Sequence, residues 1–239
     1  MRYLFLTIVL FIVYSCSHAV KKPNFTEVKV EVLYEDSLSI RAIELMNGSL
    51  AFAANKGVIG TIDLKTETVR TNIQKYDSIL PEFRAVAHTS TDFFMISVAN
   101  PALLYKTGDK GSMELVYTEV GEGVFYDSMA FWNDKEGIAI GDSVAGCLSI
   151  IITRDGGYSW SKLSCNQLPG APEGEGAFAA SNTNIVIQGN KAWVGTTEGR
   201  VYYTDNKGVS WEVFQTPILR EKPTQGIYTM DFYDCSLGI

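Results

Sequence analysis

The sequence predicts an all-β protein built from repeated four-stranded antiparallel sheets. Short runs rich in valine, isoleucine and aromatic residues alternate with turns rich in glycine, asparagine and aspartate, and long helical patterns are absent. The stretch Thr153–Trp160 recurs at Thr204–Trp211, and weaker copies lie at Thr107–Met113 and Thr61–Asp63. The aspartates of these copies are separated by 46, 46 and 50 residues, a period typical of propellers and solenoids. We therefore predict a β-propeller in which each repeat forms one blade.

Each complete repeat should contain four short strands. A fifth repeat starts and ends early, because residues 230–239 match the apolar pattern of 129–138 but are not followed by a second strand. We expect this chain to be a C-terminally truncated part of a propeller of roughly six to eight blades. The predicted blades are 36–80, 81–123, 124–172 and 173–221, with a partial blade at 222–239. The predicted strands are 40–46, 50–54, 58–62 and 68–73; 83–88, 93–99, 103–107 and 113–118; 128–132, 138–141, 148–153 and 160–165; 184–188, 192–196, 201–204 and 210–215.

The segment Thr26–Tyr34 precedes the first repeat and alternates between apolar and charged residues. Val28, Val30 and Val32 fall on one side of the segment, which indicates a half-buried strand. Because no hairpin partner precedes this strand, we expect it to be the outer strand of the last blade and to close the ring.

The repeated stretch has the chemistry of a tight turn between two strands. An aspartate there can accept hydrogen bonds from backbone N–H groups, and a glycine can adopt a positive φ. A tryptophan then begins the next strand with a large apolar surface. In this alignment Asp205 takes the place of Asp155, which puts one extra residue in the second turn. The residues assigned to these structural turns are Thr153, Asp155, Gly157, Ser159 and Trp160; Thr204, Asp205, Gly208, Ser210 and Trp211; Thr107, Asp109 and Gly111; and Thr61 and Asp63.

The N-terminus has the pattern of a targeting segment. Arg2 precedes the apolar run Tyr3–Tyr14, which is short for a membrane span, and Cys16 follows it. This pattern resembles a bacterial lipoprotein signal over residues 1–16, in which Cys16 is lipidated, followed by a tether at 17–25 and the propeller at 26–239. The alternative is an ordinary secretory signal with cleavage nearby. The basic residues of the tether favour the cell envelope, on the periplasmic side of the outer membrane.

The turn pattern resembles the Asp-box, or bacterial neuraminidase repeat. With the period and the segment Gly174–Thr183, it makes residues 36–239 similar to bacterial lipoproteins of the photosystem II stability and assembly-factor-like group. These belong to the sortilin-like and neuraminidase-repeat propellers, which are comparable to WD40 and YVTN repeats. The resemblance implies that the box joins the third and fourth strands of a blade and is a folding element remote from the binding face.

Arg41 and Arg84 occupy equivalent places at the start of the first two repeats. On the innermost strands of adjacent blades, two guanidinium groups could bind a carboxylate, sulfate or phosphate. The alternative is pairing with neighbouring acids such as Asp36 or Glu82.

Glu173 and Glu175 lie in a loop rich in glycine and proline. In a glycoside hydrolase of the sialidase type, this loop would be the candidate source of an acid/base pair. The alternative is a solvated loop between blades. The Phe/Tyr-Arg-Ile-Pro motif of sialidases has its nearest counterpart at Phe83–Val86, which lacks the proline, and no catalytic residue can be assigned from it.

The composition gives little support to other chemistries. The chain has 239 residues and a formal charge of −7 without a long basic run, which argues against nucleic acid as a partner. Its two histidines show no metal-ligand spacing, and its Gly-rich stretches lack the context of a dinucleotide site. We predict no cofactor and no metal, and the oxidoreductase label carried by some relatives is unsupported.

Cys147 and Cys165 flank the turn of the third repeat. Their numbers sum to 312, as do those of Thr153 and Ser159, so the register of the hairpin should place them opposite one another. They form either a disulfide, favoured in an oxidising compartment, or two free thiols. Cys235 has no visible partner.

These features favour a lipid-anchored, extracytoplasmic binding or assembly module for a protein or glycan partner. A glycoside hydrolase and a purely structural spacer are the alternatives. We expect the binding face to lie opposite the repeated turns, where residues 100–102, 142–146 and 197–199 form loops.

Overall fold

The computed structural model describes residues 26–108, 111–180, 182–233 and 237–239. The chain divides into two compact units, Met1–Val32 and Leu33–Ile239. None of the helices within the described ranges is long and apolar enough to cross a membrane.

The described part of the first unit is an extended segment without strand pairing. Val28, Val30 and Val32 are 80%, 86% and 76% exposed, so the prediction of a half-buried strand over Thr26–Tyr34 is wrong. Alternation gives a segment an apolar side, but a strand also needs a neighbour to accept its backbone hydrogen bonds. No such neighbour is found among the described residues.

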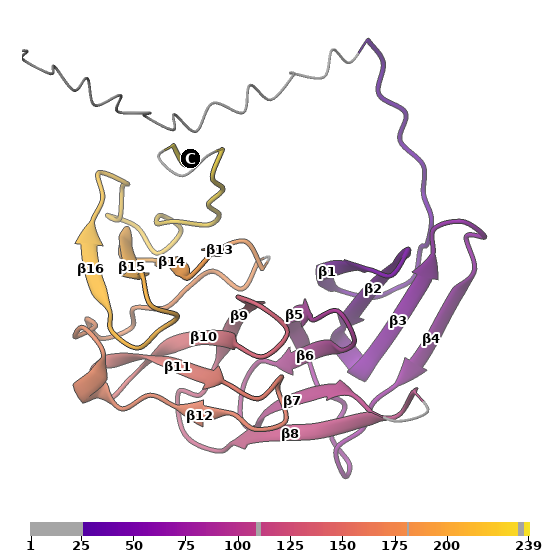
Figure 1. The fold of residues 1–239 in the computed structure, drawn as a ribbon, viewed down its shortest axis with the longest axis horizontal. Helices are drawn as coiled ribbons and strands as arrows, with labels where there is room; N and C mark the ends of the chain where they lie inside the picture. The colour runs from indigo at the N-terminus through magenta and orange to yellow at the C-terminus, as the bar shows by residue number, and fades with distance from the viewer. Residues whose placement is uncertain (1–25, 109–110, 181, 234–236) are drawn as a thin grey trace, which may run out of the picture. The chain divides into compact units, whose positions relative to one another are not determined.

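The second unit contains four antiparallel sheets, each made of four consecutive strands in sequence order (Figure 1). This arrangement confirms the predicted all-β class and the four-stranded blades, which we number 1 to 4 along the chain. The strands of blades 1 and 2 are β1 (Ile40–Met46), β2 (Ser49–Ala54), β3 (Val58–Asp63), β4 (Val69–Ile73), β5 (Phe83–His88), β6 (Phe93–Ser97), β7 (Ala102–Thr107) and β8 (Met113–Glu119). Those of blades 3 and 4 are β9 (Tyr126–Phe131), β10 (Gly137–Val144), β11 (Cys147–Thr153), β12 (Ser161–Lys162), β13 (Ile185–Gln188), β14 (Lys191–Gly195), β15 (Arg200–Thr204) and β16 (Glu212–Gln215).

Residues 222–239, predicted to begin a fifth blade, contain no strand in their described part. An isolated antiparallel bridge joins Phe232 to Gly238. The segment packs on the sheet of blade 4, where the rings of Phe232 and Trp193 are 4.4 Å apart. The backbone N–H of Ile227 donates to the carbonyl of Thr196 at 3.0 Å.

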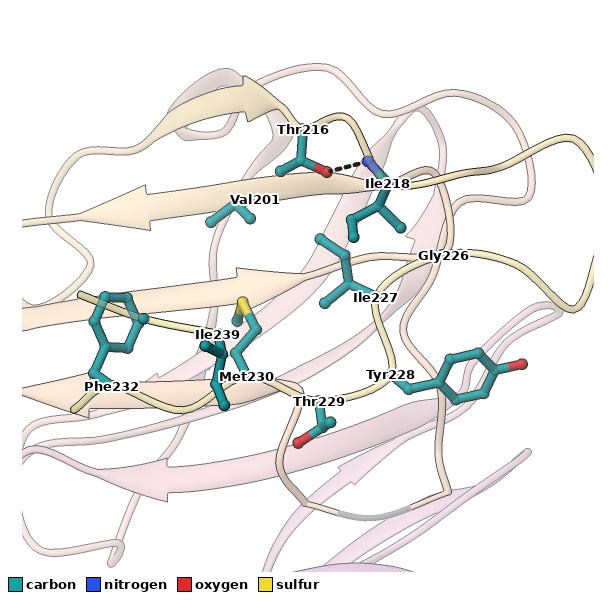
Figure 2. Close-up of a pocket in the computed structure, with 11 residues that line it drawn as sticks. Val201, Thr216, Ile218, Gly226, Ile227, Tyr228, Thr229, Met230, Phe232 and Ile239 are labelled. Atoms are coloured by element: carbon teal, nitrogen blue, oxygen red, sulfur yellow. Dashed lines mark hydrogen bonds between the residues drawn. The ribbon is translucent and has the colours of Figure 1, made fainter. Parts of the chain in front are cut away.

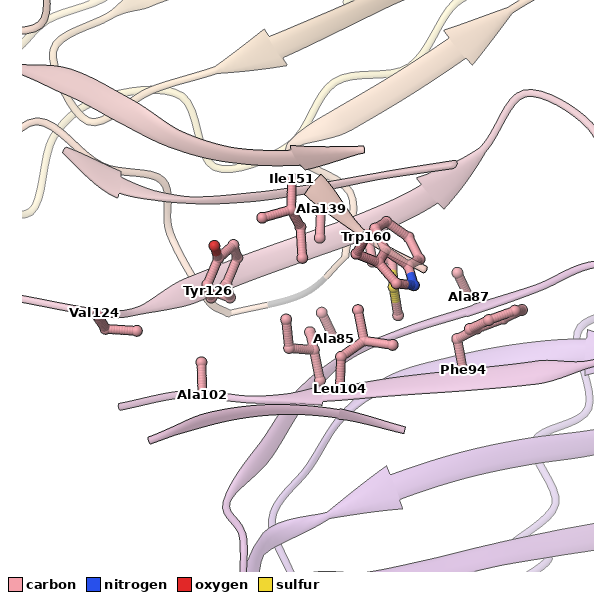
Figure 3. Close-up of a cluster of buried hydrophobic side chains, with 12 residues drawn as sticks. Ala85, Ala87, Phe94, Ala102, Leu104, Val124, Tyr126, Ala139, Ile151 and Trp160 are labelled. Atoms are coloured by element: carbon pink, nitrogen blue, oxygen red, sulfur yellow. The ribbon is translucent and has the colours of Figure 1, made fainter. Parts of the chain in front are cut away.

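The described residues form three hydrophobic core clusters, each lying between two successive blades. One joins blades 1 and 2, one joins blades 2 and 3, and one joins blades 3 and 4. Figure 3 shows the middle cluster, in which Phe94 and Leu104 of blade 2 face Tyr126, Ile151 and Trp160 of blade 3. A sheet covered on both faces needs apolar residues on both faces, which explains why every residue of β11 is buried.

The turn between β11 and β12 is organised by the side chains of Thr153 and Asp155. The Thr153 hydroxyl donates to Asp155 Oδ1 at 2.9 Å and accepts the N–H of Gly157 at 2.9 Å. Ser159 donates to the same carboxylate from its N–H at 3.0 Å and from its hydroxyl at 2.6 Å. Burial acts to raise the pKa of Asp155, but the hydrogen bonds from Ser159 and Thr153 outweigh it and hold the pKa below its ordinary value.

Gly157 allows this turn to pack against blade 2. Its φ is +81°, and an added Cβ would lie 2.2 Å from Phe94 Cε1. Trp160 follows and is buried against the same ring, with the centroids 6.4 Å apart. The stretch therefore joins two blades as well as two strands, as expected of a folding element.

The corresponding turn of blade 4 corrects the alignment made from the sequence. Asn206, and not Asp205, takes the position of Asp155, because its Oδ1 accepts from the Thr204 hydroxyl at 3.0 Å and from the Ser210 N–H at 2.9 Å. Gly208 donates its N–H to the Thr204 hydroxyl at 2.9 Å, as Gly157 does to Thr153. The two turns therefore have the same length. Asp205 is exposed, and Trp211 packs on the cluster between blades 3 and 4.

The weaker copies in blades 1 and 2 differ from these two turns. Asp63 accepts the N–H groups of Lys65 and Thr66 at 2.9 and 2.8 Å, which lowers its pKa, and Thr61 is an exposed residue of β3. The Thr107 hydroxyl donates to Asp92, in the turn between β5 and β6, at 3.0 Å. Asp109 lies outside the described residues, and Gly111 has the positive φ, +76°, expected of a turn glycine.

Candidate functional site

Arg41 and Arg84 each lie in the first strand of a blade, at a point where the pairing register with the second strand shifts. Ile40 pairs with Ala54 and Ala42 with Ala53, so Arg41 is an extra residue in β1. Arg84 has the same place in β5. An extra residue of this kind is a β-bulge, which bends the strand and redirects a side chain. β1 and β5 are in contact, so the two arginines occupy equivalent positions on neighbouring strands.

Neither arginine is paired with an acid among the described residues. Arg41 is exposed, and its Nε donates to Ser39 Oγ at 3.0 Å. Arg84 is half-buried. Of the acids considered as partners, Asp36 accepts the Tyr34 hydroxyl at 2.9 Å, and Glu82 accepts the backbone N–H of Lys56 at 3.4 Å. The predicted alternative of pairing with these acids is therefore not seen.

The third blade carries an aspartate at the equivalent position. Asp127 is the extra residue in β9, because Ser128 pairs with Ile140 and Tyr126 with Gly141. Asp127 was not among the candidate residues predicted from the sequence, although Arg41, Arg84 and Asp127 follow one another at intervals of 43 residues. The position thus changes from basic in blades 1 and 2 to acidic in blade 3.

Asp127 is fully buried beside a second carboxyl group, that of Asp142 on β10. Burial, followed by the charge of Asp142, raises the pKa of Asp127 well above its ordinary value. Burial also raises the pKa of Asp142 to about 6. Two carboxylates cannot donate to each other, so a hydrogen bond between them requires one proton, and the pair titrates as a unit.

The carboxyl groups of Glu173 and Glu175 do not form an acid/base pair. Glu173 is exposed, whereas Glu175 is fully buried and forms an ion pair with Arg200 of β15. Glu175 also accepts hydrogen bonds from the hydroxyls of Thr196 at 2.7 Å and Tyr202 at 2.9 Å. Glu175 is thus an internal anchor of the connection between blades 3 and 4. The predicted acid/base pair is therefore not seen, and the predicted solvated loop between blades is exposed at Glu173 but buried at Glu175.

Asn182 connects the same segment to the first strands of two blades. Its side-chain amide donates to the carbonyls of Val86 on β5 at 2.9 Å and Met129 on β9 at 2.7 Å. Its oxygen accepts the N–H of Met129 at 2.9 Å. One side chain therefore holds blades 2 and 3 to the segment that enters blade 4.

Cys147 and Cys165 are joined by a disulfide, with their sulfur atoms 2.02 Å apart. The predicted register was off by one residue, because Ile152 pairs with Ser161, giving a sum of 313. Cys165 lies beyond β12 in the short helix Cys165–Gln167. The bond therefore ties the start of β11 to the connection toward blade 4. Cys16 and Cys235 lie outside the described residues.

An apolar groove of about 520 Å³ lies between blade 4 and the C-terminal segment (Figure 2). Its lining includes Val201, Ile218, Ile227, Met230 and Phe232, and none of the described residues that line it has a charged side chain. The groove is unsuited to an anion, and it lies on a different blade from Arg41 and Arg84.

The polar network of Tyr126 and Glu119 does not have the properties of a nucleophile. The hydroxyls of Tyr126 and Tyr117 donate to Glu119 Oε2, each at 2.7 Å, and Lys162 forms an ion pair with Glu119. Burial and the neighbouring carboxylate raise the pKa of Tyr126, whereas an attacking phenolate needs a lowered pKa. Within the described part of the chain, no group of three or more potential metal ligands is found.

The fold and its neighbours place the chain among the β-propellers. The structure of U3-55K matches with a TM-score of 0.61 and 12% identity, covering 84% of this chain and 57% of that one. The WD40 repeats of RRP9 match with a TM-score of 0.59 and 12% identity over 84% and 57% of the two chains. The β-propeller domain of Cps50 (Swd1) from Myceliophteria thermophila matches at 0.54 and 14%, over 81% and 59%.

These likenesses concern the fold alone, because the identities are low. The chain spans less than three fifths of each of the three neighbouring chains. No protein-family model matches the sequence, and no curated protein does.

Proposed function

We propose that this chain is a non-catalytic binding module that holds an anionic group of a protein or glycan partner with Arg41 and Arg84. The proposal rests on one observation: two guanidinium groups occupy equivalent bulges on adjacent first strands and lack an acidic partner within the described residues. Arginine forms paired hydrogen bonds with carboxylate, sulfate and phosphate groups.

The position of the two arginines in the blade also suits binding. In an antiparallel blade, the start of the first strand lies at the same rim as the loop between the second and third strands. That rim is opposite the turns built on Thr153 and Thr204. Loops at the rim of a rigid scaffold are common binding surfaces, so a partner there would leave the folding turns undisturbed.

The double substitution Arg41→Ala/Arg84→Ala tests the proposal. Each charge-assisted hydrogen bond contributes about 1.5–3 kcal/mol, so the loss of both arginines should weaken binding at least tenfold. We would titrate the protein with a glutamate-rich peptide, a sialylated oligosaccharide and inorganic phosphate, and record heats of binding.

Arg70→Ala is the matched control, because Arg70 is an exposed arginine on β4, the last strand of blade 1. Equal affinities for the double variant and this control, with any ligand that binds, would contradict the assignment. Release of free sialic acid from the oligosaccharide would instead favour the glycosidase alternative. If phosphate binds but the peptide and the oligosaccharide do not, the arginines form an anion site and the proposed protein or glycan partner is not supported.

We further propose that the module is tethered to a membrane of the cell envelope through a lipid on Cys16. The support is the sequence pattern of residues 1–16, and more than one acyl chain gives firm anchoring. The variant Cys16→Ser should move the protein from the membrane fraction to the soluble fraction in a bacterial host that processes lipoproteins. Mass spectrometry of the mature N-terminus checks the lipid. A wild-type protein that carries no lipid would refute this part of the proposal and leave the binding site unaffected.

A further inference from the structure

Residues 170–180, which we call the strap, connect blade 3 to blade 4 and pack against the pair Asp127–Asp142. Backbone hydrogen bonds hold the strap to its neighbours: Ser143 donates to the carbonyl of Glu175 at 2.8 Å, and Thr197 donates to that of Gly176 at 2.9 Å. Gly176 lies so near Asp142 that an added Cβ would be 1.7 Å from Asp142 Oδ1. The strap therefore covers part of the carboxyl pair, in which Asp127 is fully buried and Asp142 is half-buried.

Among the described residues, no cationic side chain acts on this pair. The groups that act on the Asp127 carboxyl are the side chain of Asp142 and the backbone N–H of Ala177. Glu175, the acid of the strap, is bound to Arg200, and the hydroxyl of Tyr126 is bound to Glu119. The N–H of Ala177 is not placed for a hydrogen bond to Asp127, so both oxygens of this carboxyl are without a hydrogen-bond partner among the described residues. A buried carboxyl in this setting is stable only if it keeps a proton or gains water.

We propose that one proton shared by Asp127 and Asp142 acts as a latch that holds the strap closed, and that loss of this proton opens the strap. With the proton in place, one carboxyl donates to the other and the pair carries at most one charge. Without it, the negative charge of the buried Asp127 and that of the half-buried Asp142 repel each other beneath the strap. Opening the strap admits water to both carboxyls and relieves this repulsion.

The direction of the pH dependence follows from the protons bound in each state. In the closed state the pair retains a proton, because burial raises both pKa values. In the open state both carboxyls return toward an ordinary pKa of about 4 and are ionised at neutral pH. Opening therefore releases one proton, so the opening equilibrium constant should rise up to tenfold for each pH unit. The strap should be closed more tightly in acid than in mild base.

Hydrogen exchange of the full chain, followed by mass spectrometry between pH 6 and pH 8.5, tests the latch. After correction for the intrinsic exchange rate at each pH, the protection of peptides from the strap should fall by up to tenfold for each pH unit. Peptides from β6 and β7, residues 93–107, should show no such slope. This readout needs no ligand and is independent of the proposed anion site.

The substitution Asp127→Asn replaces the protonated carboxyl with an amide that can still donate to Asp142. The slope in the strap should disappear in this variant and in Asp142→Asn, which tests the pair from the other strand. Glu173→Gln, an exposed acid of the same strap, should keep the wild-type slope. The proposal is overturned if exchange of the wild-type strap does not depend on pH, or if its pH dependence persists in both asparagine variants. If neither variant folds, the pH dependence of the wild-type strap alone decides.

Discussion

Replacing Arg200 with methionine is expected to lower the free energy of unfolding by about 3–5 kcal/mol, the usual cost of breaking a buried ion pair by removing one partner. Glu175 is fully buried, whereas the side chain of Arg200 is 15% exposed. The variant leaves a carboxylate in the interior with only the hydroxyls of Thr196 and Tyr202 to stabilise it. Denaturation in urea at neutral pH, analysed by linear extrapolation, measures the loss.

Two further variants separate the buried charge from a general effect of removing arginine. Arg220→Met removes an exposed arginine 4.0 Å from Glu198 and should cost less than about 1 kcal/mol. The double variant Glu175→Gln/Arg200→Met should be more stable than Arg200→Met alone, because it removes the uncompensated charge. If the double variant loses more stability than the single one, the anchoring role of the ion pair is wrong.

Removing the disulfide is expected to lower the free energy of unfolding by about 3 kcal/mol in the double variant Cys147→Ser/Cys165→Ser. The two cysteines are 18 residues apart, and closing a loop of this length restricts the unfolded chain by about that amount. For a domain of this size, the loss corresponds to a decrease in Tm of about 6–12 °C. Thermal unfolding monitored by circular dichroism provides the measurement.

Reduction supplies the control for this effect. Dithiothreitol should lower the Tm of the wild-type protein toward that of the double variant and leave the double variant unchanged. An equal shift in both proteins would show that the reductant acts elsewhere. A wild-type Tm that does not respond, in protein shown by alkylation to be reduced, would mean that the bond contributes no stability.

The blades were the most predictable part of the molecule. Their strands are short and separated by turns, and the inner strands such as β11 are apolar on both faces, so pattern alone located most of them to within a few residues. β12 is the largest exception, since it is only Ser161–Lys162. The chain leaves the sheet there because the disulfide at Cys165 and the short helix that begins with it draw it toward blade 4.

The predictions from sequence were wrong where a contact with another part of the chain, and not the local pattern, determines the structure. Thr26–Tyr34 alternates like a strand but has no neighbour to pair with in the part of the chain that the structure describes. Asp205 has the acidic side chain typical of this turn, but the turn needs an oxygen two residues after Thr204, and the amide of Asn206 supplies it.

The polar interior of the connection between blades 3 and 4 could not be predicted from the sequence. Glu175 lies among glycines and looks solvated until Arg200, 25 residues away, is brought beside it. Asn182 contacts Val86 across 96 residues. Asp127 is different, because the interval that relates Arg41 to Arg84 leads directly to it, and aligning the repeats on their first strands would have found it.

The bulges at Arg41, Arg84 and Asp127 also affect how such a protein can evolve by mutation. An extra residue lies outside the ladder of backbone hydrogen bonds, so its side chain can be exchanged without altering which residues pair. Each of blades 1 to 3 then offers one position at which natural variation can test a new charge or size while the sheet is conserved. Duplicated blades could in this way acquire different ligand preferences one codon at a time.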